Sequence, residues 1–283
     1  GGVDLAYFYY NKKLIKNAGL DFENNPPRTR AEFDEALEKI KATGVIPIVC
    51  DESNFNAGHL NVFAAFYWYL QTAGRDRIIS NSWGETKFVN DQAFMDYLEY
   101  YQSLYARGYI NQDCATSTNS LERFLAEEAA LIPTGNWYLE NIKTVLEEDT
   151  GIMRPPEFTS GTEITNGIIG GPGQCAVVSK GCEHPELAVD FISFLSSKDE
   201  VIRFHKVVQR LPLRTDVTPA ELGWEGQPLY SKLLDFAKDY VYWVDNSINP
   251  AVNSEITRLM SLVLTGKMTP SELAEALDRV ASE

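Results

Sequence analysis

The chain has 283 residues, of which 44% are hydrophobic and 23% charged, the balance of an ordinary globular protein long enough for two lobes or one large domain. Its 40 acidic residues outnumber 25 Lys and Arg residues and give a net charge of −15, which repels phosphate backbones and argues against DNA or RNA as a partner. No apolar run approaches the roughly 20 residues needed to cross a bilayer, and no basic start followed by an apolar core indicates a signal peptide.

The first part of the chain predicts helices that alternate with short strands. Thr29 to Glu32 has the Thr-x-x-Glu pattern of a capping box, and apolar residues then recur at Phe33, Leu37 and Ile40 on one helix face. Further expected elements are a buried strand at 45–49, an aromatic helix at 58–73, and a helix capped by Asn90 that ends at Gly108.

The rest of the chain continues this alternation, with helices in the majority. In a helix expected at 184–195, Leu187, Phe191 and Leu195 share one face and are expected to point inward. Other expected elements are helices at 121–129 and 136–146, strands at 130–132 and 175–179, capping boxes at 197–200 and 269–272, and loop-rich crossovers at 153–173 and 211–226. Together these elements predict a helix-rich α/β fold.

Cysteines and histidines form no recognisable metal or redox motif. Cys50, Cys114, Cys175 and Cys182 contain no C-x-x-C pair and no zinc-ligand spacing with the three histidines. Cys175 and Cys182 are close enough in sequence to pair across a turn, with two free thiols as the alternative. We therefore expect neither a metal nor a cofactor.

Catalytic motifs are also missing. The sequence has no H-E-x-x-H, no G-x-S-x-G elbow, no P-loop and no G-x-G-x-x-G. Neighbouring acids at 51–52, 127–128 and 147–149 could serve as the acid and base of a glycosidase. Adjacent acids on a helix point in different directions, however, so a solvated face is the favoured interpretation and no catalytic residue is expected.

Aromatic residues are the unusual part of the composition, since 14 Phe, 14 Tyr and 5 Trp make up 12% of the chain. Sugars present flat C–H faces that stack on aromatic rings, and their hydroxyls need polar groups around the rim. Aromatic residues at helical spacing, such as Phe63, Phe66 and Tyr67, are more often part of a core. Composition therefore favours a carbohydrate site only weakly.

Several short patterns, taken in order, resemble the family 1 extracellular solute-binding proteins of ABC importers. The patterns YFYYNKKL at 7–14, AGLD at 18–21 and PPRTRAEF at 26–33 resemble that family's "Y-N-K … G-L … P-P-x-T-W-x-E-F" run, with Arg30 in place of the usual Trp. Downstream, FLAEEAALIPTGNW at 124–137, with Glu128 where Gly is usual, is followed by ELAVDFISFL at 186–195 and LPLR at 211–214. The patterns span almost the whole chain.

The resemblance implies a type II periplasmic-binding-protein-like fold. Residues 1–171 and 216–283 would form the C-terminal ligand-binding lobe, and residues 172–215 would cross over to complete the N-terminal lobe. Family members carry further residues ahead of the Y-N-K run, and these supply the signal, any lipid anchor and most of the first lobe.

The resemblance also implies where a ligand binds. Trp137, with Asn136 beside it, is expected to stack on a sugar face from a helix N-terminus, and a core Trp is the alternative. Gly170 and Gly171 would let the ligand approach the crossing backbone, unless they are plain turn glycines. Further candidates are Asn56 and His59 at the rim, with simple capping as their alternative, and Trp83, Arg214 and Asn253.

The implied function is capture without catalysis. Two lobes would close on a sugar or oligosaccharide and deliver it to the permease of an ABC transporter. The protein is expected to be extracellular or periplasmic, either free or as a lipoprotein that contacts the membrane through the permease or an N-terminal lipid anchor. A two-carboxylate glycosidase and an interaction module are the alternatives, and polyols, oligopeptides and polyamines are alternative ligands.

Overall fold

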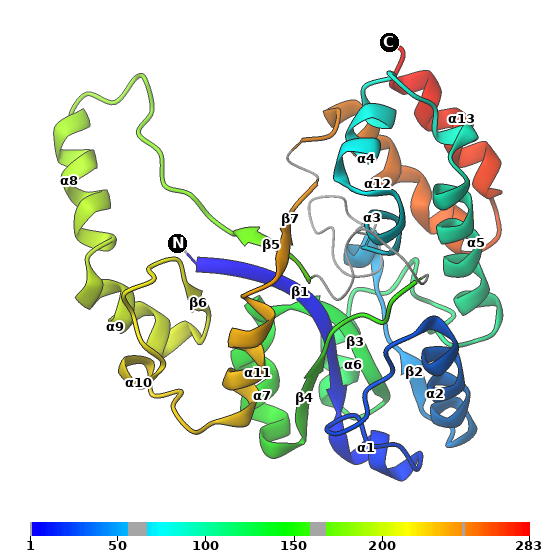
Figure 1. Ribbon diagram of the computed structural model, residues 1–283, viewed down its shortest axis with the longest axis horizontal. Helices are drawn as coiled ribbons and strands as arrows, with labels where there is room; N and C mark the ends of the chain where they lie inside the picture. Colours follow the sequence, from blue (N-terminus) through cyan, green and yellow to red (C-terminus); the bar gives the residue numbers. More distant parts are fainter. Residues whose placement is uncertain (1, 56–66, 159–167, 245–246) are drawn as a thin grey trace.

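The computed structural model describes residues 2–55, 67–158, 168–244 and 247–283, and within them one mixed sheet organises the chain (Figure 1). Its centre is β1 (Gly2–Asn11), and the strand order is β2-β3-β1-β5-β7. Along one edge β1 pairs with β6 and β3, and along the other with β5 and β4, so four strands lie against it. The remaining strands are β2 (Ile46–Ile48), β3 (Ala129–Gly135), β4 (Thr150–Met153), β5 (Ile168–Pro172), β6 (Leu211–Pro212) and β7 (Tyr240–Tyr242).

Both faces of β1 are buried from Leu5 onward, which explains why residues 5–10 form an apolar run instead of an alternating pattern. The even-numbered residues Ala6, Phe8 and Tyr10 belong to one hydrophobic core. The odd-numbered Tyr7 and Tyr9 belong to a second core on the opposite face. We call these the even-face core and the odd-face core.

The even-face core is rich in aromatic side chains. Trp68 packs edge-on against Tyr100 at 5.2 Å and its indole N–H donates to the Pro156 carbonyl at 3.1 Å. Arg30, which stands where the family pattern usually has Trp, lies over the rings of Tyr100 and Phe158 at 5.0 and 5.2 Å. It therefore packs against aromatic side chains of this core. The helices that contribute are α1 (Lys12–Asn17), α2 (Arg30–Ala42), α3 (Tyr67–Ala73), α4 (Arg75–Ser82), α5 (Gln92–Ala106), α12 (Pro250–Leu264) and α13 (Pro270–Val280).

The odd-face core is smaller and contains a hydrogen-bonded tyrosine pair. The hydroxyls of Tyr7 and Tyr9 are 2.7 Å apart, and Trp224 stacks on Tyr230 at 4.7 Å. Its helices are α6 (Ser120–Leu125), α7 (Leu139–Leu146), α10 (Pro219–Leu222) and α11 (Pro228–Phe236); α1 (Lys12–Asn17) follows β1. None of the helices in the described ranges combines the length and apolarity needed to span a bilayer.

Two of the three predicted capping boxes are confirmed. Thr29 accepts from the Glu32 N–H and Thr269 from the Glu272 N–H, and both glutamates bond back to the cap. At 197–200 the box is wrong: α9 (Lys198–Val208) begins where expected, but the Ser197 side chain makes no cap bond, and Glu200 pairs with Arg203. The predicted cap at Asn90 is wrong by one residue, since α5 is preceded by Asp91.

The strand predicted at 175–179 is wrong. The strand is β5, which ends at Pro172, and residues 173–179 have no regular structure. Gly170 is paired with Leu5 in this strand, and a Cβ there would lie 2.7 Å from the Asp4 carbonyl oxygen, so only glycine fits against β1. Both glycines pair with β1, so the alternative reading of them as plain turn glycines is wrong, and their approach to a ligand stays a prediction.

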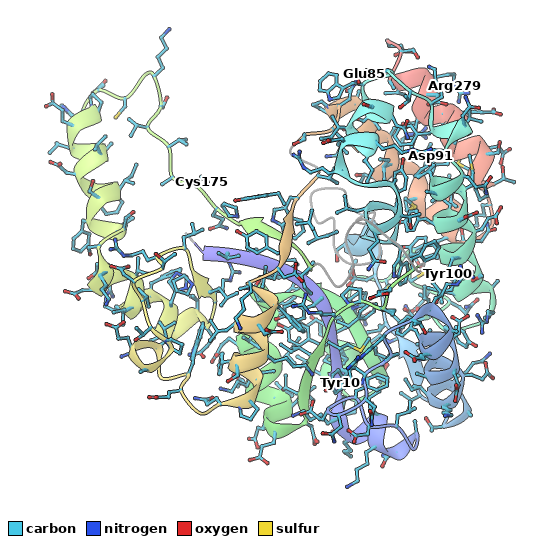
Figure 2. All side chains as sticks on the ribbon, viewed as in Figure 1. Tyr10, Glu85, Asp91, Tyr100, Cys175 and Arg279 are labelled. Carbon is cyan, nitrogen blue, oxygen red and sulfur yellow. The ribbon has the colours of Figure 1, made fainter. Side chains whose placement is uncertain are left out.

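Residues 173–210, which we call the arm, leave the body of the molecule (Figure 1). Contrary to prediction, Leu187, Phe191 and Leu195 of α8 (Pro185–Leu195) are 66%, 60% and 46% exposed, because no described element covers that helix. Figure 2 shows Cys175 at the base of the extended segment that leads to α8, and both Cys175 and Cys182 are free thiols.

Candidate ligand-binding site

The first residues of β1 provide the floor of the candidate site. Asp4 and Ala6 lie two residues apart and therefore share the even face of the sheet. Gly135 of β3 is paired with Ala6 on one side, and Gly171 of β5 is paired with Asp4 on the other. Directly opposed residues of an antiparallel pair point to the same face, so all four positions face the same way.

Trp137 covers the β3 side of this floor. It lies in the 3-10 turn Asn136–Tyr138 that links β3 to α7, and a Cβ at Gly135 would overlap its Cζ3 and Cη2 atoms. The indole therefore folds back on the strand that precedes it, and only glycine at position 135 permits this contact. Trp137 is half-buried and belongs to neither hydrophobic core of the described residues, so its ring is not sealed in the interior.

Asn136 is a fully buried residue that completes the sheet. The β3–β1 ladder ends at Ala6 and the β6–β1 ladder covers only Gly2 and Val3, which leaves a gap. The Asn136 side chain fills it: its Oδ1 accepts from the Leu5 N–H at 2.9 Å and its Nδ2 donates to the Val3 carbonyl at 2.8 Å. Its amide thus replaces a strand backbone and fixes the turn that carries Trp137.

Trp243 covers the β5 side of the floor, and sequence reasoning missed it. The backbone N–H of Trp243 donates to the Gly170 carbonyl at 3.0 Å, and this bond holds the Trp243 ring beside Gly171. A Cβ at Gly171 would lie 3.1 Å from the Trp243 ring and 3.3 Å from the Tyr242 ring, and the φ of +151° at Gly171 also disfavours any side chain. The run Tyr240-Val241-Tyr242-Trp243 was the signal that could have revealed this second platform.

Asp4 is the acidic group of the floor and was also missed. Its carboxylate reaches over Gly173, where a Cβ would overlap Oδ2, and its Oδ1 lies 3.9 Å from Nη1 of Arg210. Burial raises the pKa of Asp4, and the Arg210 guanidinium opposes this shift. The available signal was a single acid within the apolar sequence of β1, because a carboxylate is rarely buried unless it has a partner.

A family model described as "Bacterial extracellular solute-binding protein" matches residues 3–229. The chain belongs to this family. The sn-glycerol-3-phosphate-binding periplasmic protein UgpB of Shigella flexneri is 24% identical over 289 residues, a match that covers 97% of this chain and 64% of the relative. The chain thus spans somewhat less than two thirds of the length of this curated relative.

Solved structures share the fold. A chitin oligosaccharide binding protein superposes with a TM-score of 0.86 at 24% identity, covering 99% of this chain and 70% of the other. A sugar transporter protein from Bacillus licheniformis, in complex with stachyose, gives a TM-score of 0.74 at 21% identity and covers 98% and 71%. The predicted family and the periplasmic-binding-protein-like α/β fold are both confirmed.

The other predicted site residues that the structure describes are Trp83, Arg214 and Asn253. Trp83 is 52% exposed and donates from its indole to the Ser247 carbonyl at 3.0 Å, which brings it to the segment that follows Trp243. Arg214 pairs with Asp216 and donates to the Ser196 carbonyl at 3.0 Å, which ties it to the base of the arm. Asn253 lies on α12 with its amide oxygen buried, and Asn56 and His59 fall outside the described residues. Their roles in binding stay predictions.

A separate open pocket of about 590 Å³ lies where α2 and α5 end, and Lys41, Arg107 and Arg123 are the basic residues of its otherwise mostly neutral lining. Lys41 donates to the Arg107 carbonyl, Arg107 pairs with Asp34, and Arg123 pairs with Asp113. The two arginines are ion-paired within the chain and the lysine is hydrogen-bonded to a carbonyl, and the pocket contains no residue of the candidate site.

Proposed function

We propose that this chain is the greater part of the binding component of an ABC importer, which captures a sugar or oligosaccharide outside the cytoplasm and hands it to the permease. The observation that carries the proposal is the pair of indoles, Trp137 and Trp243, that flank Asp4 on one face of the sheet. Aromatic rings bind the C–H faces of a pyranose, and a carboxylate accepts hydrogen bonds from its hydroxyls.

The floor of the site suits an uncharged ligand better than a phosphate ester. A phosphate would face the Asp4 carboxylate in a partly buried setting, where like charges repel most strongly. Arg210 is the cation nearest to Asp4 among the described residues, and it is engaged by that carboxylate. The curated relatives are named for sn-glycerol 3-phosphate and a structural neighbour for chitin oligosaccharide, and the Asp4 carboxylate favours the second ligand class for this chain.

Two lobes are part of the proposal. The apolar face of the arm, formed by Leu187, Phe191 and Phe194 of α8 and Val207 of α9, is exposed, and apolar patches of this kind mark interaction surfaces. We propose that this face packs, in the full-length protein, against the part of the relatives' length that this chain does not span. The ligand would then lie between that lobe and the floor described above, and lobe closure would present it to the permease.

The proposed role needs no catalytic group. Three of the acids considered for a glycosidase are engaged elsewhere: Glu127 pairs with Lys13, Glu128 with Arg123, and Asp51 accepts from the Ser120 hydroxyl at 2.6 Å. Their partners hold loops and helix starts in place, which supports a structural role. Location is proposed to be extracellular or periplasmic, as a free protein or a lipoprotein.

A thermal-shift screen of the full-length protein tests the proposal. The screen compares neutral mono- and oligosaccharides with sn-glycerol 3-phosphate, and it includes Trp137→Ala and the exposed control Val145→Ala on α7. Neutral saccharides should raise Tm in the parent and in Val145→Ala, and Trp137→Ala should abolish the shift. A shift with the phosphate ester alone, or product release from chromogenic glycosides, would contradict the proposal.

A further inference from the structure

Two cysteines that lie far apart in the sequence, Cys50 and Cys114, are both hydrogen-bonded to Asn111. The Asn111 side chain accepts from the Cys50 backbone N–H at 2.8 Å and donates to the Cys50 carbonyl at 3.0 Å. The Asn111 carbonyl accepts from the Cys114 backbone N–H at 3.2 Å. These three hydrogen bonds confine the two cysteine backbones to the surroundings of one buried residue.

The side chains of both cysteines enter the even-face core and are fully buried. Burial raises the pKa of the Cys50 thiol, and the next cause is the neighbouring Cys114 sulfur. The pKa of the Tyr101 hydroxyl is also raised, by burial first, then by Tyr97, and then by Cys50 and Cys114. The two thiols therefore act on each other and on the same phenol.

We propose that Cys50 and Cys114 are the partners of a structural disulfide, which would join the chain after β2 to the loop after α5. In this structure both thiols are free. The inference takes from the proposed function only the location outside the cytoplasm, where disulfides form and persist. The bond would close a loop of roughly 60 residues and so remove much of the freedom of the unfolded chain.

The oxidation needs a disulfide as the oxidant, such as oxidised glutathione or a protein disulfide. The thiolate of one cysteine attacks the oxidant and releases one thiol, and this forms a mixed disulfide. The thiolate of the second cysteine then attacks the protein sulfur of the mixed disulfide and releases the second thiol. Two cysteine thiols and one oxidant disulfide thus give one protein disulfide and two oxidant thiols, which take up the two protons.

The bond has to form while the chain folds. Burial raises the pKa of Cys114 to about 12 and that of Cys50 well above its ordinary value, so both sulfurs stay protonated and unreactive once the core has closed. The same burial would shield the finished disulfide from reductants.

The test is refolding of the protein from urea in oxidised and reduced glutathione, with Cys175→Ser and Cys182→Ser to remove the two less buried thiols. When the product is unfolded without reductant and alkylated, neither remaining cysteine should be labelled, and a tryptic digest should contain peptide 42–75 joined to peptide 108–123. Its Tm should be about 5–15 °C above that of the same protein refolded in dithiothreitol. Adding Cys114→Ser should abolish both the cross-link and this difference in Tm.

The outcomes are distinct from those of the sugar screen. The disulfide is overturned if both thiols stay free after refolding, if glutathione remains on either cysteine, or if the cross-linked form melts no higher than the reduced form. The comparison of oxidised and reduced forms needs no substitution at Cys50 or Cys114, so it decides even if Cys114→Ser does not fold. A cross-link in a protein that binds no sugar would support the disulfide while the binding function fails, and sugar binding without a cross-link would overturn the disulfide alone.

Discussion

Two apolar helices, α5 in the body and α8 in the arm, differ in burial: α5 is packed into a core and α8 is exposed. Six residues of α5 are buried, among them Phe94, Tyr97 and Tyr101, which pack on one another and on α3. α8 is at least as apolar, since seven of its eleven residues are Leu, Ala, Val, Phe or Ile, yet it buries none. An apolar face therefore indicates that a helix needs a partner, but not whether the same chain supplies it.

The largest expected effect comes from the same substitution made in both helices. Phe94→Ala should lower the free energy of unfolding of this chain by about 3–5 kcal/mol, because it opens a cavity among Tyr69, Phe88 and Tyr97. Phe191→Ala should change it by less than about 0.5 kcal/mol, because its ring is mostly in water. Urea unfolding of the two variants measures both values.

The comparison fails if the two variants lose similar stability in this chain. It becomes sharper in a longer chain that includes the part of the relatives' length not spanned here, where Phe191→Ala should become destabilising if that part covers α8 as proposed. Phe94→Ala should cost the same in both settings, and so it is the control for the length of the chain.

The amphipathic helices of the body could be predicted from the sequence because their signals are local. Thr29 and Glu32 cap α2, and Thr269 and Glu272 cap α13, through side chains only three residues apart. The arm could not be predicted in the same way, because the inward face assigned to Leu187 depends on a surface that the described residues do not contain.

The candidate site could be predicted only on one side. Trp137 was identifiable because it belongs to a contiguous pattern with Gly135, and the structure keeps its ring outside both cores. Asp4 and Trp243 each carry a local signal, but their meeting at one site could not be predicted, because the sheet brings together positions more than 200 residues apart and a single sequence does not reveal strand order. Asn136 was expected to serve a ligand, but its two described hydrogen bonds go to β1.

The next largest effect concerns the body where it meets the site. Asn136→Ala should lower the free energy of unfolding by about 1–3 kcal/mol, because it leaves the buried Leu5 N–H and Val3 carbonyl without their partner. The exposed neighbour Tyr138→Ala is the control and should stay close to the parent. Indole fluorescence should also change in Asn136→Ala if the turn that carries Trp137 loosens. A fluorescence spectrum and a stability equal to those of the parent would contradict the role of the Asn136 side chain in replacing a strand backbone beside β1.

A smaller effect is expected where the arm is tied to the body. Gln209 has a left-handed φ of +55°, and its side-chain oxygen accepts from the Trp224 indole at 3.2 Å and from the Tyr230 hydroxyl. Gln209→Asn keeps a residue that tolerates this backbone but is too short to reach both donors, so it should cost about 1 kcal/mol. Hydrogen exchange should speed up in α9 more than in α5. Equal acceleration in both helices would show that Gln209 does not tie the arm specifically.

The smallest effect is a pH dependence at the second tie between arm and body. Lys198 of α9 donates to Glu221 of α10 at 2.8 Å, and with the Thr218 cap this lowers the pKa of Glu221 to about 2. Because the folded pKa is below the ordinary value of 4.5, the contribution of this carboxylate is fully present above pH 4.5 and fades as the pH falls towards 2. Glu221→Gln removes the titrating group, so the stability difference between parent and variant should shrink over this range while both lose the contributions of their other carboxylates alike. Urea unfolding between pH 5 and 2.5 measures the difference, and a gap that stays constant would show that Glu221 is not coupled to folding.

The body offers a contrast at Glu272, whose pKa is lowered by the Thr269 cap alone. Lys198→Ala should therefore leave the pH dependence of the Glu272 contribution to stability unchanged, whereas it should diminish that of Glu221.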